Sequence, residues 1–332
     1  MNRCAICGGT SGQVVHTREM LHGFRDPFEY FECVTCGCVQ LITPPAEMGK
    51  FYPRDYYSFA KPSLPNLPPV PKGRLRRWIY EKRNEAQVLK SGGLWGMIAA
   101  KRPRPDIRPD FIDPSIRNVS GINLRSRVLD VGCGAGRLLL NMRQVGFVNL
   151  TGIDPFLVDS ISEPCPGVKI LAQDIERHDG GPYDLIMMHH SLEHMHNQFD
   201  SMKSARRLLS ARGTLLIRIP CVSSRPWKLY RADWVNLDPP RHYYLHSHDS
   251  LRRLASSTGF KVSRLICDSN AFSYAGSELY KRDTPINRGS DGGYVNFDHE
   301  LGKEVVADFQ RQAEQDNIKL EGDCIAAYLE PV

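Results

Sequence analysis

The feature that most constrains the fold is a buried strand that runs directly into a glycine-rich turn. Residues 127–131 read Arg-Val-Leu-Asp-Val, and Gly132, Gly134 and Gly136 follow as a helical pattern begins. Glycine adopts backbone angles that other residues avoid, and it lets a ligand approach the main chain closely. The N-terminus of the following helix offers unpaired N–H groups to an anionic group. The segment therefore predicts a ligand-binding strand–turn–helix unit.

Six further segments have the composition of strands, so that seven are expected in all. The seven are 127–131, 148–153, 168–172, 183–190, 213–220, 260–268 and 324–330. Helical patterns fall between several of them, at 136–146, 198–210, 247–258 and about 300–315. Such alternation is typical of an α/β fold in which helices cover both faces of a mostly parallel sheet.

Composition divides the chain into three parts, which we expect to be residues 1–45, 46–118 and 119–332. The middle part is rich in Pro and holds fifteen Lys or Arg against seven Asp or Glu, although the whole chain has a net charge of only +6. One amphipathic helix is expected in it, at 73–90. A basic segment of this kind can meet phosphates, nucleic acid or an anionic membrane surface, or it can be a solvated linker.

Two Cys-x-x-Cys pairs stand near the N-terminus, Cys4 with Cys7 and Cys33 with Cys36, separated by 25 residues. Zinc prefers four tetrahedral thiolates, and each pair can bring two sulfurs to about 2.3 Å from one ion. About 40 residues bury too little apolar surface to fold alone, whereas bound zinc supplies on the order of 10 kcal/mol. We therefore predict a small zinc ribbon with structural zinc. The alternative is four unpaired thiols.

Acidic residues stand at the ends of the first three strands of the predicted sheet. Asp130 lies in the first strand, Asp154 ends the second, 22 residues after Gly132, and Asp174 and Ile175 follow the third. The carboxyl ends of parallel strands meet at the edge where such sheets bind ligands. A carboxylate at Asp154 can accept both hydroxyls of a ribose, and hydrogen bonds to a charged group contribute about 1.5–3 kcal/mol. Asp174 can accept from an adenine amino group while Ile175 covers the ring.

Four segments in this order resemble the class I S-adenosylmethionine-dependent methyltransferases, in particular the subgroup that includes the ubiquinone-biosynthesis O-methyltransferases. They are VLDVGCGAGRLL, GID, QDI and YDLIMMHHSLEH, within about 119–270. The resemblance implies a Rossmann-like class I methyltransferase fold and S-adenosylmethionine as the cofactor. The cofactor-binding residues then expected are Asp130, Gly132, Cys133, Gly134, Gly136, Asp154, Asp174, Ile175 and His189.

The front of the chain is similar to bacterial methyltransferases that carry a zinc ribbon. The similarity lies in the cysteine pairs, in FYPRDYY at 51–57 and in DPPRH at 238–242. Those proteins often lie in gene clusters for polysaccharides, lipids or sugar-containing natural products. The resemblance implies O- or C-methylation of a small-molecule acceptor such as a sugar or a lipid-linked saccharide. Two alternatives remain: an RNA methyltransferase that grips nucleic acid with the ribbon and basic segment, and an inactive methyltransferase-like binding subunit.

The expected catalytic residues are His242, His190, His194 and Glu193. Methyl transfer mainly needs positioning, but a hydroxyl acceptor of high pKa also needs a general base, which is most often His. Ubiquinone-type enzymes and methyltransferases of the 3′-terminal ribose of small RNAs show Glu-x-x-Glu-His here and bind a divalent ion. This chain has His190 at the first position. By that resemblance the four residues can form a metal site, or Glu193 and His194 simply begin a helix.

The remaining expectations concern location and shape. The chain has no run of 18 apolar residues and no apolar signal core at its N-terminus, so we expect a cytoplasmic protein without a membrane-spanning helix. Ten cysteines in such a chain favour metal binding or reduced thiols. Trp227, Tyr230 and Trp234 can either cover a flat acceptor or pack against the edge of the sheet. Nothing in the sequence specifies an oligomeric state.

Overall fold

The central sheet of the protein has seven strands. The computed structural model describes residues 2–52, 73–89, 93–94, 98, 101, 112–157, 163–287 and 293–332. The strands of the sheet lie in the order β10-β11-β8-β7-β4-β5-β6. They are β4 (Arg127–Val131), β5 (Asn149–Ile153), β6 (Val168–Leu171), β7 (Tyr183–His189), β8 (Leu209–Pro220), β10 (Phe260–Cys267) and β11 (Cys324–Pro331). The five strands from β8 to β6 are parallel, and β11 pairs antiparallel with both β8 and β10. This arrangement confirms the Rossmann-like α/β fold.

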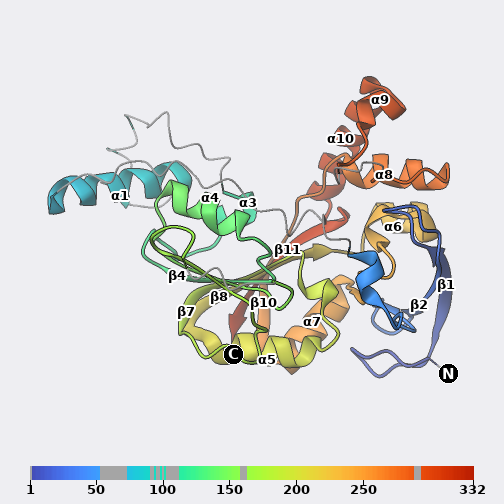
Figure 1. The fold of residues 1–332 in the computed structure, drawn as a ribbon, viewed down its shortest axis with the longest axis horizontal. Helices are drawn as coiled ribbons and strands as arrows, with labels where there is room; N and C mark the ends of the chain where they lie inside the picture. Colours follow the sequence, from blue (N-terminus) through green and yellow to red (C-terminus); the bar gives the residue numbers. More distant parts are fainter. Residues whose placement is uncertain are drawn as a thin grey trace.

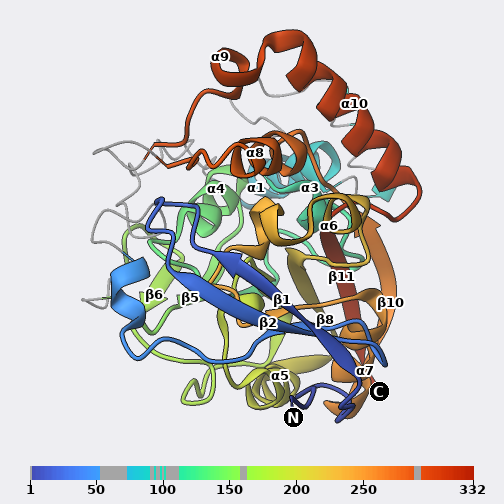
Figure 2. The ribbon, with the colours of Figure 1, turned by 90° about the vertical axis from the view of Figure 1, so that its right-hand side faces the viewer.

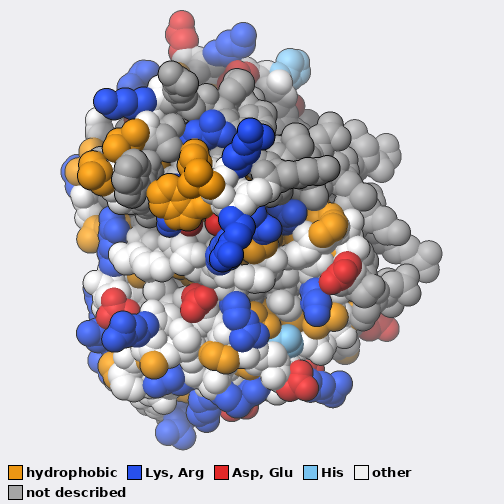
Figure 3. Space-filling view, turned by 90° about the vertical axis from the view of Figure 1, so that its left-hand side faces the viewer, with side chains coloured by type: hydrophobic (Ala, Val, Ile, Leu, Met, Phe, Trp, Pro, Cys, Tyr) orange, Lys and Arg blue, Asp and Glu red, His pale blue; other side chains and the backbone are white. Residues whose placement is uncertain are grey.

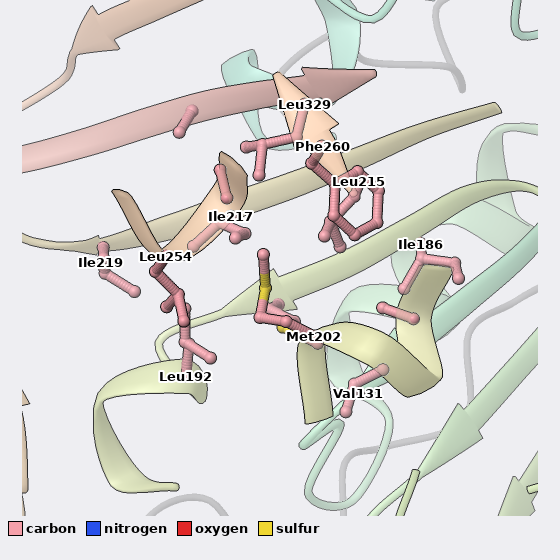
Figure 4. Close-up of a cluster of buried hydrophobic side chains, with 14 of the residues drawn as sticks. Val131, Ile186, Leu192, Met202, Leu215, Ile217, Ile219, Leu254, Phe260 and Leu329 are labelled. Atoms are coloured by element: carbon pink, nitrogen blue, oxygen red, sulfur yellow. The ribbon is translucent and has the colours of Figure 1, made fainter. Parts of the chain in front are cut away.

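Helices cover both faces of this sheet (Figure 1). On one face lie α5 (Gln198–Leu208) and α7 (His248–Ser257), and on the other lie α1 (Arg74–Val88), α3 (Pro114–Arg117) and α4 (Arg137–Val145). Alternate residues of a strand point to opposite faces, so Ile186 packs under α5 while its neighbour Met187 packs under α4. Figure 4 shows the apolar cluster between the sheet and α5 and α7, with Met202 of α5 facing Ile217 and Leu254. Burial on both faces explains why the strands read as nearly continuous apolar runs.

A second, antiparallel sheet joins the N-terminus to the rest of the protein. Its strands are β1 (Gly12–Arg18), β2 (Pro27–Cys33), β3 (Val39–Leu41) and β9 (Tyr244–Leu245). The fourth strand comes from the segment between β8 and α7. The cysteine-bearing part therefore shares a sheet with a strand from the later part of the chain. Figure 2 shows β1 and β2 lying across one end of the molecule, where the indole N–H of Trp227 in α6 (Arg225–Tyr230) donates to Glu32 of β2 at 3.1 Å.

The remaining elements cap the same end of the sheet. They are the short turns η1 (Met48–Phe51), η4 (Leu192–His194), η5 (Arg231–Asp233) and η6 (Val235–Leu237), and the helices α8 (Phe272–Lys281), α9 (Phe297–Leu301) and α10 (Lys303–Ile318). Trp227 and Trp234 are buried here among apolar side chains. These aromatic residues therefore pack as core, and they do not cover an acceptor.

The middle part of the chain is only partly described. Of the expected helix at 73–90, α1 forms, and Val88 and Leu89 are buried against α4 together with Ile112 and Ile116. The expected irregular stretches PSLPNLPPVPKG (62–73) and KRPRPDIRP (101–109) lie almost entirely outside the described residues, as does most of the FYPRDYY segment. Within the described part of the chain, no helix is long and apolar enough to cross a membrane.

Local signals fix most element ends. Helix α7 begins after Ser247, the first residue of the expected helical segment, where the Ser247 hydroxyl and the Ser250 side chain satisfy each other's backbone N–H groups. Helix α4 ends at Gly146, whose φ of 118° suits glycine. Strand β8 begins at Leu209, earlier than the expected 213, because helix α5 ends at Leu208.

Candidate active site

The glycine-rich turn after β4 has the backbone that only glycine adopts easily. Gly132, Gly134 and Gly136 have φ of 75°, 51° and 80°. A Cβ at Gly132 would lie 2.5 Å from the Cβ of Ser191, and a Cβ at Gly136 would collide with Ile170. The N–H groups of Gly132 and Cys133 donate to the carbonyl of Ile153, which ties the turn to the end of β5. The turn is thus a rigid main-chain surface at the carboxyl edge of the sheet.

The carboxylates of Asp130 and Asp154 lie against this turn. One oxygen of Asp154 accepts the N–H of Gly134 at 2.9 Å, and the other accepts the N–H of Phe156 at 2.9 Å. Burial, together with the charge of Asp154, raises the pKa of Asp130 to about 8. Two buried carboxylates near each other without a cation between them favour a positively charged ligand.

The other three residues expected at the cofactor lie in different surroundings. Asp174, partly exposed after β6, accepts the N–H of Arg177 at 3.0 Å. Ile175 is buried in the apolar cluster beneath α5. His189 lies under α3, with its Nε2 3.0 Å from the hydroxyl of Ser115, and burial lowers its pKa to about 4. The roles of these three residues stay predictions.

A cavity of about 280 Å³ opens at the carboxyl ends of β7 and β8. All four residues expected to be catalytic line it: His190, Glu193, His194 and His242. Glu193 and His194 lie in the turn η4 directly after β7, and His242 arrives from the segment before β9. The wall is polar at Arg218 and Asp268 and apolar at Phe272, Tyr280 and Ile286.

Hydrogen bonds fix the orientation of two imidazoles in this cavity. Nδ1 of His242 donates to the carbonyl of Asn236 at 2.8 Å, and Nδ1 of His194 donates to the carbonyl of Arg241 at 2.9 Å. A carbonyl only accepts, so both Nδ1 atoms carry hydrogen and both Nε2 atoms keep a lone pair while the rings are neutral. The ring centroids are 4.7 Å apart.

The carboxylate of Glu193 completes this group. Glu193 is fully buried; its Oε1 accepts from His190 at 3.2 Å, and no hydrogen-bond partner is found for its Oε2 among the described groups. Burial raises the pKa of Glu193, but the hydrogen bond from His190 and the nearby His194 outweigh it, so that the pKa falls to about 2. Glu193, His194 and His242 each offer a ligand atom within 4.8 Å of the others. The group can move a proton or hold a cation.

The four expected zinc ligands also come together. The sulfur atoms of Cys4, Cys7, Cys33 and Cys36 lie within 4.8 Å of one another, at the end of the β1–β2 hairpin. Gly37 follows the second pair with φ of 71°. Four thiols at this spacing from two Cys-x-x-Cys turns fit one tetrahedral zinc ion. Cys38, for which the sequence indicated no role, is buried beside them.

Comparison with known proteins agrees with this fold. Residues 105–265 match the family model described as a methyltransferase domain. Among curated proteins, no significant match is found. Residues 105–265 therefore carry a methyltransferase domain on a Rossmann-like sheet. The protein is an S-adenosylmethionine-dependent methyltransferase.

Similar solved structures are found at low identity and low TM-score. The cyclopropane synthase MmaA2 from Mycobacterium tuberculosis is 16% identical with a TM-score of 0.43, and the match covers 68% of this chain and 87% of that one. A SAM-dependent methyltransferase from Archaeoglobus fulgidus is 19% identical with a TM-score of 0.40, over 63% and 86%. The magnesium protoporphyrin IX methyltransferase from Synechocystis PCC 6803, with bound SAM, is 20% identical with a TM-score of 0.32, over 43% and 64%. At these values the identification rests on the family match.

Proposed function

We propose that this enzyme methylates a hydroxyl-bearing small molecule, a sugar, lipid-linked saccharide or natural-product intermediate, in the cavity beside His242. The observation that carries the proposal is the convergence of Glu193, His194 and His242 in that cavity. The polar wall at Arg218 and Asp268 and the apolar wall at Phe272 suit an acceptor with both hydroxyl groups and a hydrophobic face. Resemblance to the ribbon-bearing bacterial enzymes supports the same class of acceptor.

The residues around the glycine-rich turn fit S-adenosylmethionine. The turn from Gly132 to Gly136 packs closely on Ser191 and Ile170, and this packing holds its main chain at the carboxyl edge of the sheet, where such folds bind ligands. Asp130 and Asp154 favour a ligand with cationic groups, and this cofactor carries an ammonium and a sulfonium. Bound there, it supplies an electrophilic methyl group. We assign the ribose to Asp154 and the adenine to Asp174.

His242 is the proposed general base. Its Nδ1 donates to the carbonyl of Asn236, so Nε2, which lies 3.8 Å from a carboxylate oxygen of Asp238, keeps a lone pair that can accept the acceptor's hydroxyl proton. Burial and the neighbouring His194 lower the pKa of His242 to about 4, so the imidazole is neutral at pH 7. The carboxylate of Glu193 stabilises the imidazolium once the proton has moved.

A divalent cation is a second candidate for activating the acceptor. The unpartnered Oε2 of Glu193 and the imidazoles of His194 and His242 form a nitrogen and oxygen ligand set. A strong chelator separates the two mechanisms, provided that zinc in the cysteine site is shown to persist. Methyl transfer that survives chelation supports the general base, and loss that Mn²⁺ restores supports the cation.

We further propose the domain organisation. Residues 1–45 form a module held by structural zinc at Cys4, Cys7, Cys33 and Cys36, residues 46–118 connect it, and residues 119–332 form the catalytic domain. Four thiolates leave no open position on the zinc, so the ion serves structure.

The function is tested in two steps. Calorimetry should show that Asp154→Asn weakens S-adenosylmethionine binding by at least about tenfold, because a carboxylate bonds more strongly than an amide. Asp184→Asn, at the amino end of β7, is the control and should bind normally. Radiolabelled methyl transfer to nucleotide sugars and lipid-linked saccharides then tests the acceptor, and His242→Gln should abolish transfer while keeping cofactor affinity. Failure of the unmodified protein to bind the cofactor would instead support an inactive binding subunit.

A further inference from the structure

Helix α1 carries an exposed apolar stripe. Leu75, Trp78 and Ile79 are 69%, 40% and 44% exposed, although each is a large hydrophobic residue. Residues three and four apart lie on one face of a helix, so the three form a continuous stripe. An exposed apolar group of this kind on a helix that is otherwise charged marks an interaction surface.

The stripe faces away from the body of the protein. The opposite side of α1 is buried at Tyr80, Asn84 and Val88, which follow one another at four-residue spacing. Asn84 donates to the carbonyl of Val145 at 3.3 Å, and Val88 packs in the core cluster with α4. With about 3.6 residues per turn, Leu75, Trp78 and Ile79 lie on the side opposite these contacts. Packing on the sheet therefore fixes the helix and leaves the stripe uncovered by α4.

Positive charge borders the stripe. Helix α1 contains five Lys or Arg, at 74, 76, 77, 82 and 83, against two Glu, at 81 and 85. Both acids are engaged, Glu81 with Arg77 and Arg125, and Glu85 with Lys82 at 2.7 Å. Figure 3 shows this side of the molecule, where Lys and Arg side chains surround the exposed hydrophobic ones. With five cations against two acids, the net charge of the helix is positive.

We propose that α1 docks on an anionic phospholipid surface, with Leu75, Trp78 and Ile79 in the headgroup region and the arginines against lipid phosphates. Interfacial helices combine an apolar face, Trp near the boundary and flanking Lys or Arg in this way. RNA is bound mainly by aromatic rings that stack on its bases and by cations that contact its phosphates, so the aliphatic side chains of Leu75 and Ile79 suit a lipid surface better. The surface is separate from the cofactor and acceptor sites, so the inference goes beyond the proposed function.

The test is co-sedimentation of the full chain with phospholipid vesicles. Vesicles of phosphatidylcholine with phosphatidylglycerol should bind the protein, and pure phosphatidylcholine vesicles should bind it much less. The triple variant Leu75→Ser, Trp78→Ser, Ile79→Ser should lower the partition coefficient by at least about tenfold. The matched control is Val305→Ser with Ile318→Ser, which removes exposed apolar side chains from α10 and should bind like the unmodified chain.

A second variant tests the charge. Arg74→Gln with Arg76→Gln should weaken binding to anionic vesicles and reduce its dependence on salt, because fewer charges face the lipid. Unchanged calorimetric binding of S-adenosylmethionine shows that each variant is folded. The proposal is overturned if anionic vesicles do not bind the chain, or if the serine triple variant binds them equally well. The proposal is also overturned if the chain binds single-stranded RNA more tightly than anionic vesicles and the serine triple variant loses that RNA binding, because the surface would then be a nucleic-acid surface.

Discussion

At the scale of single residues, the cofactor edge depends on positions where no side chain fits. Gly132 and Gly136 combine positive φ with a neighbour in the path of a Cβ, Ser191 for one and Ile170 for the other. Other glycines of the chain have positive φ in open space, as Gly121 does at 79°. The effect of backbone strain at a positive φ can therefore be separated by experiment from the effect of a collision between a new Cβ and its neighbour.

We expect Gly132→Ala to weaken S-adenosylmethionine binding by at least about tenfold, because the new methyl group displaces the turn from Ser191. Isothermal calorimetry measures the affinity. Gly121→Ala carries similar backbone strain at a site with no neighbour within 4 Å, and it should leave affinity unchanged. Equal affinity in the two variants would show that the turn does not contact the cofactor.

Buried histidines give the stability of this protein a dependence on pH. His246 is fully buried between Ser250 and Gln198, and burial lowers its pKa to about 4. The unfolded chain protonates this group near pH 6.5, so its contribution to stability is present above pH 6.5 and is lost as pH falls toward 4. The total is on the order of 3 kcal/mol.

Urea denaturation at several pH values tests this expectation. His246→Gln should flatten the fall in unfolding free energy between pH 7 and pH 5, because one fewer buried group takes up a proton on unfolding. The exposed His16 gives the control variant His16→Gln. Identical slopes for His246→Gln and the unmodified protein would contradict the assignment.

At the scale of elements, the N-terminal module holds the segment that carries His242, the proposed base. Leu41 of β3 donates its N–H to the carbonyl of Tyr243 at 2.9 Å, and the hydroxyl of Tyr30 donates to the carbonyl of His242 at 2.8 Å. The hydroxyl of Ser247 donates to the carbonyl of Cys36 at 2.5 Å. The proposed base thus belongs to a segment whose backbone is held from outside by the cysteine-bearing hairpin.

Removal of the proposed zinc from this module should loosen residues 241–247 while the main sheet stays folded. We expect amide exchange there to rise at least about tenfold, because the partners of these backbone groups lose their support. Hydrogen–deuterium exchange with mass spectrometry measures the rates before and after chelation, with α5 as the internal reference. A uniform rise across both regions would instead indicate global unfolding.

At the scale of the whole molecule, a buried ion pair joins the end of the N-terminal strand β1 to the segment before β9, more than 200 residues later in the chain. Arg241 and Glu19 are both fully buried, with Nη2 of Arg241 3.0 Å from Oε1 of Glu19, and Asp238 contacts the same guanidinium. Removing one partner of such a pair leaves a charge that is buried without compensation. The pair therefore couples folding of the N-terminal module to that of the catalytic domain.

Arg241→Ala should lower the unfolding free energy by about 3–5 kcal/mol, measured by urea denaturation. The control is Arg253→Ala, which removes an exposed ion pair on α7 and should leave the unfolding free energy nearly unchanged. A cost for Arg241→Ala as small as that of the control would show that this ion pair does not couple the N-terminal strands to the segment before β9.

The sequence alone determined the local units of this protein. Short sequence patterns predict the main strands, the glycine-rich turn, the start of the helix at Ser247 and the two cysteine pairs. They do so because strand burial and tight turns depend on neighbouring residues. The approach of His242 to Glu193 and His194 was expected only through resemblance. Boundaries such as the start of β8 depended on where the adjoining helix ended.

Only the tertiary structure decided how these units meet. Pairing of β3 with β9, burial of Glu19 against Arg241 and the packing of Trp227 and Trp234 as core join segments far apart in the chain. Such contacts are set by the shapes and charges of surfaces that form after the local elements do, so no short pattern encodes them. For the same reason, the outward direction of the apolar stripe on α1 followed from what its opposite face packs against.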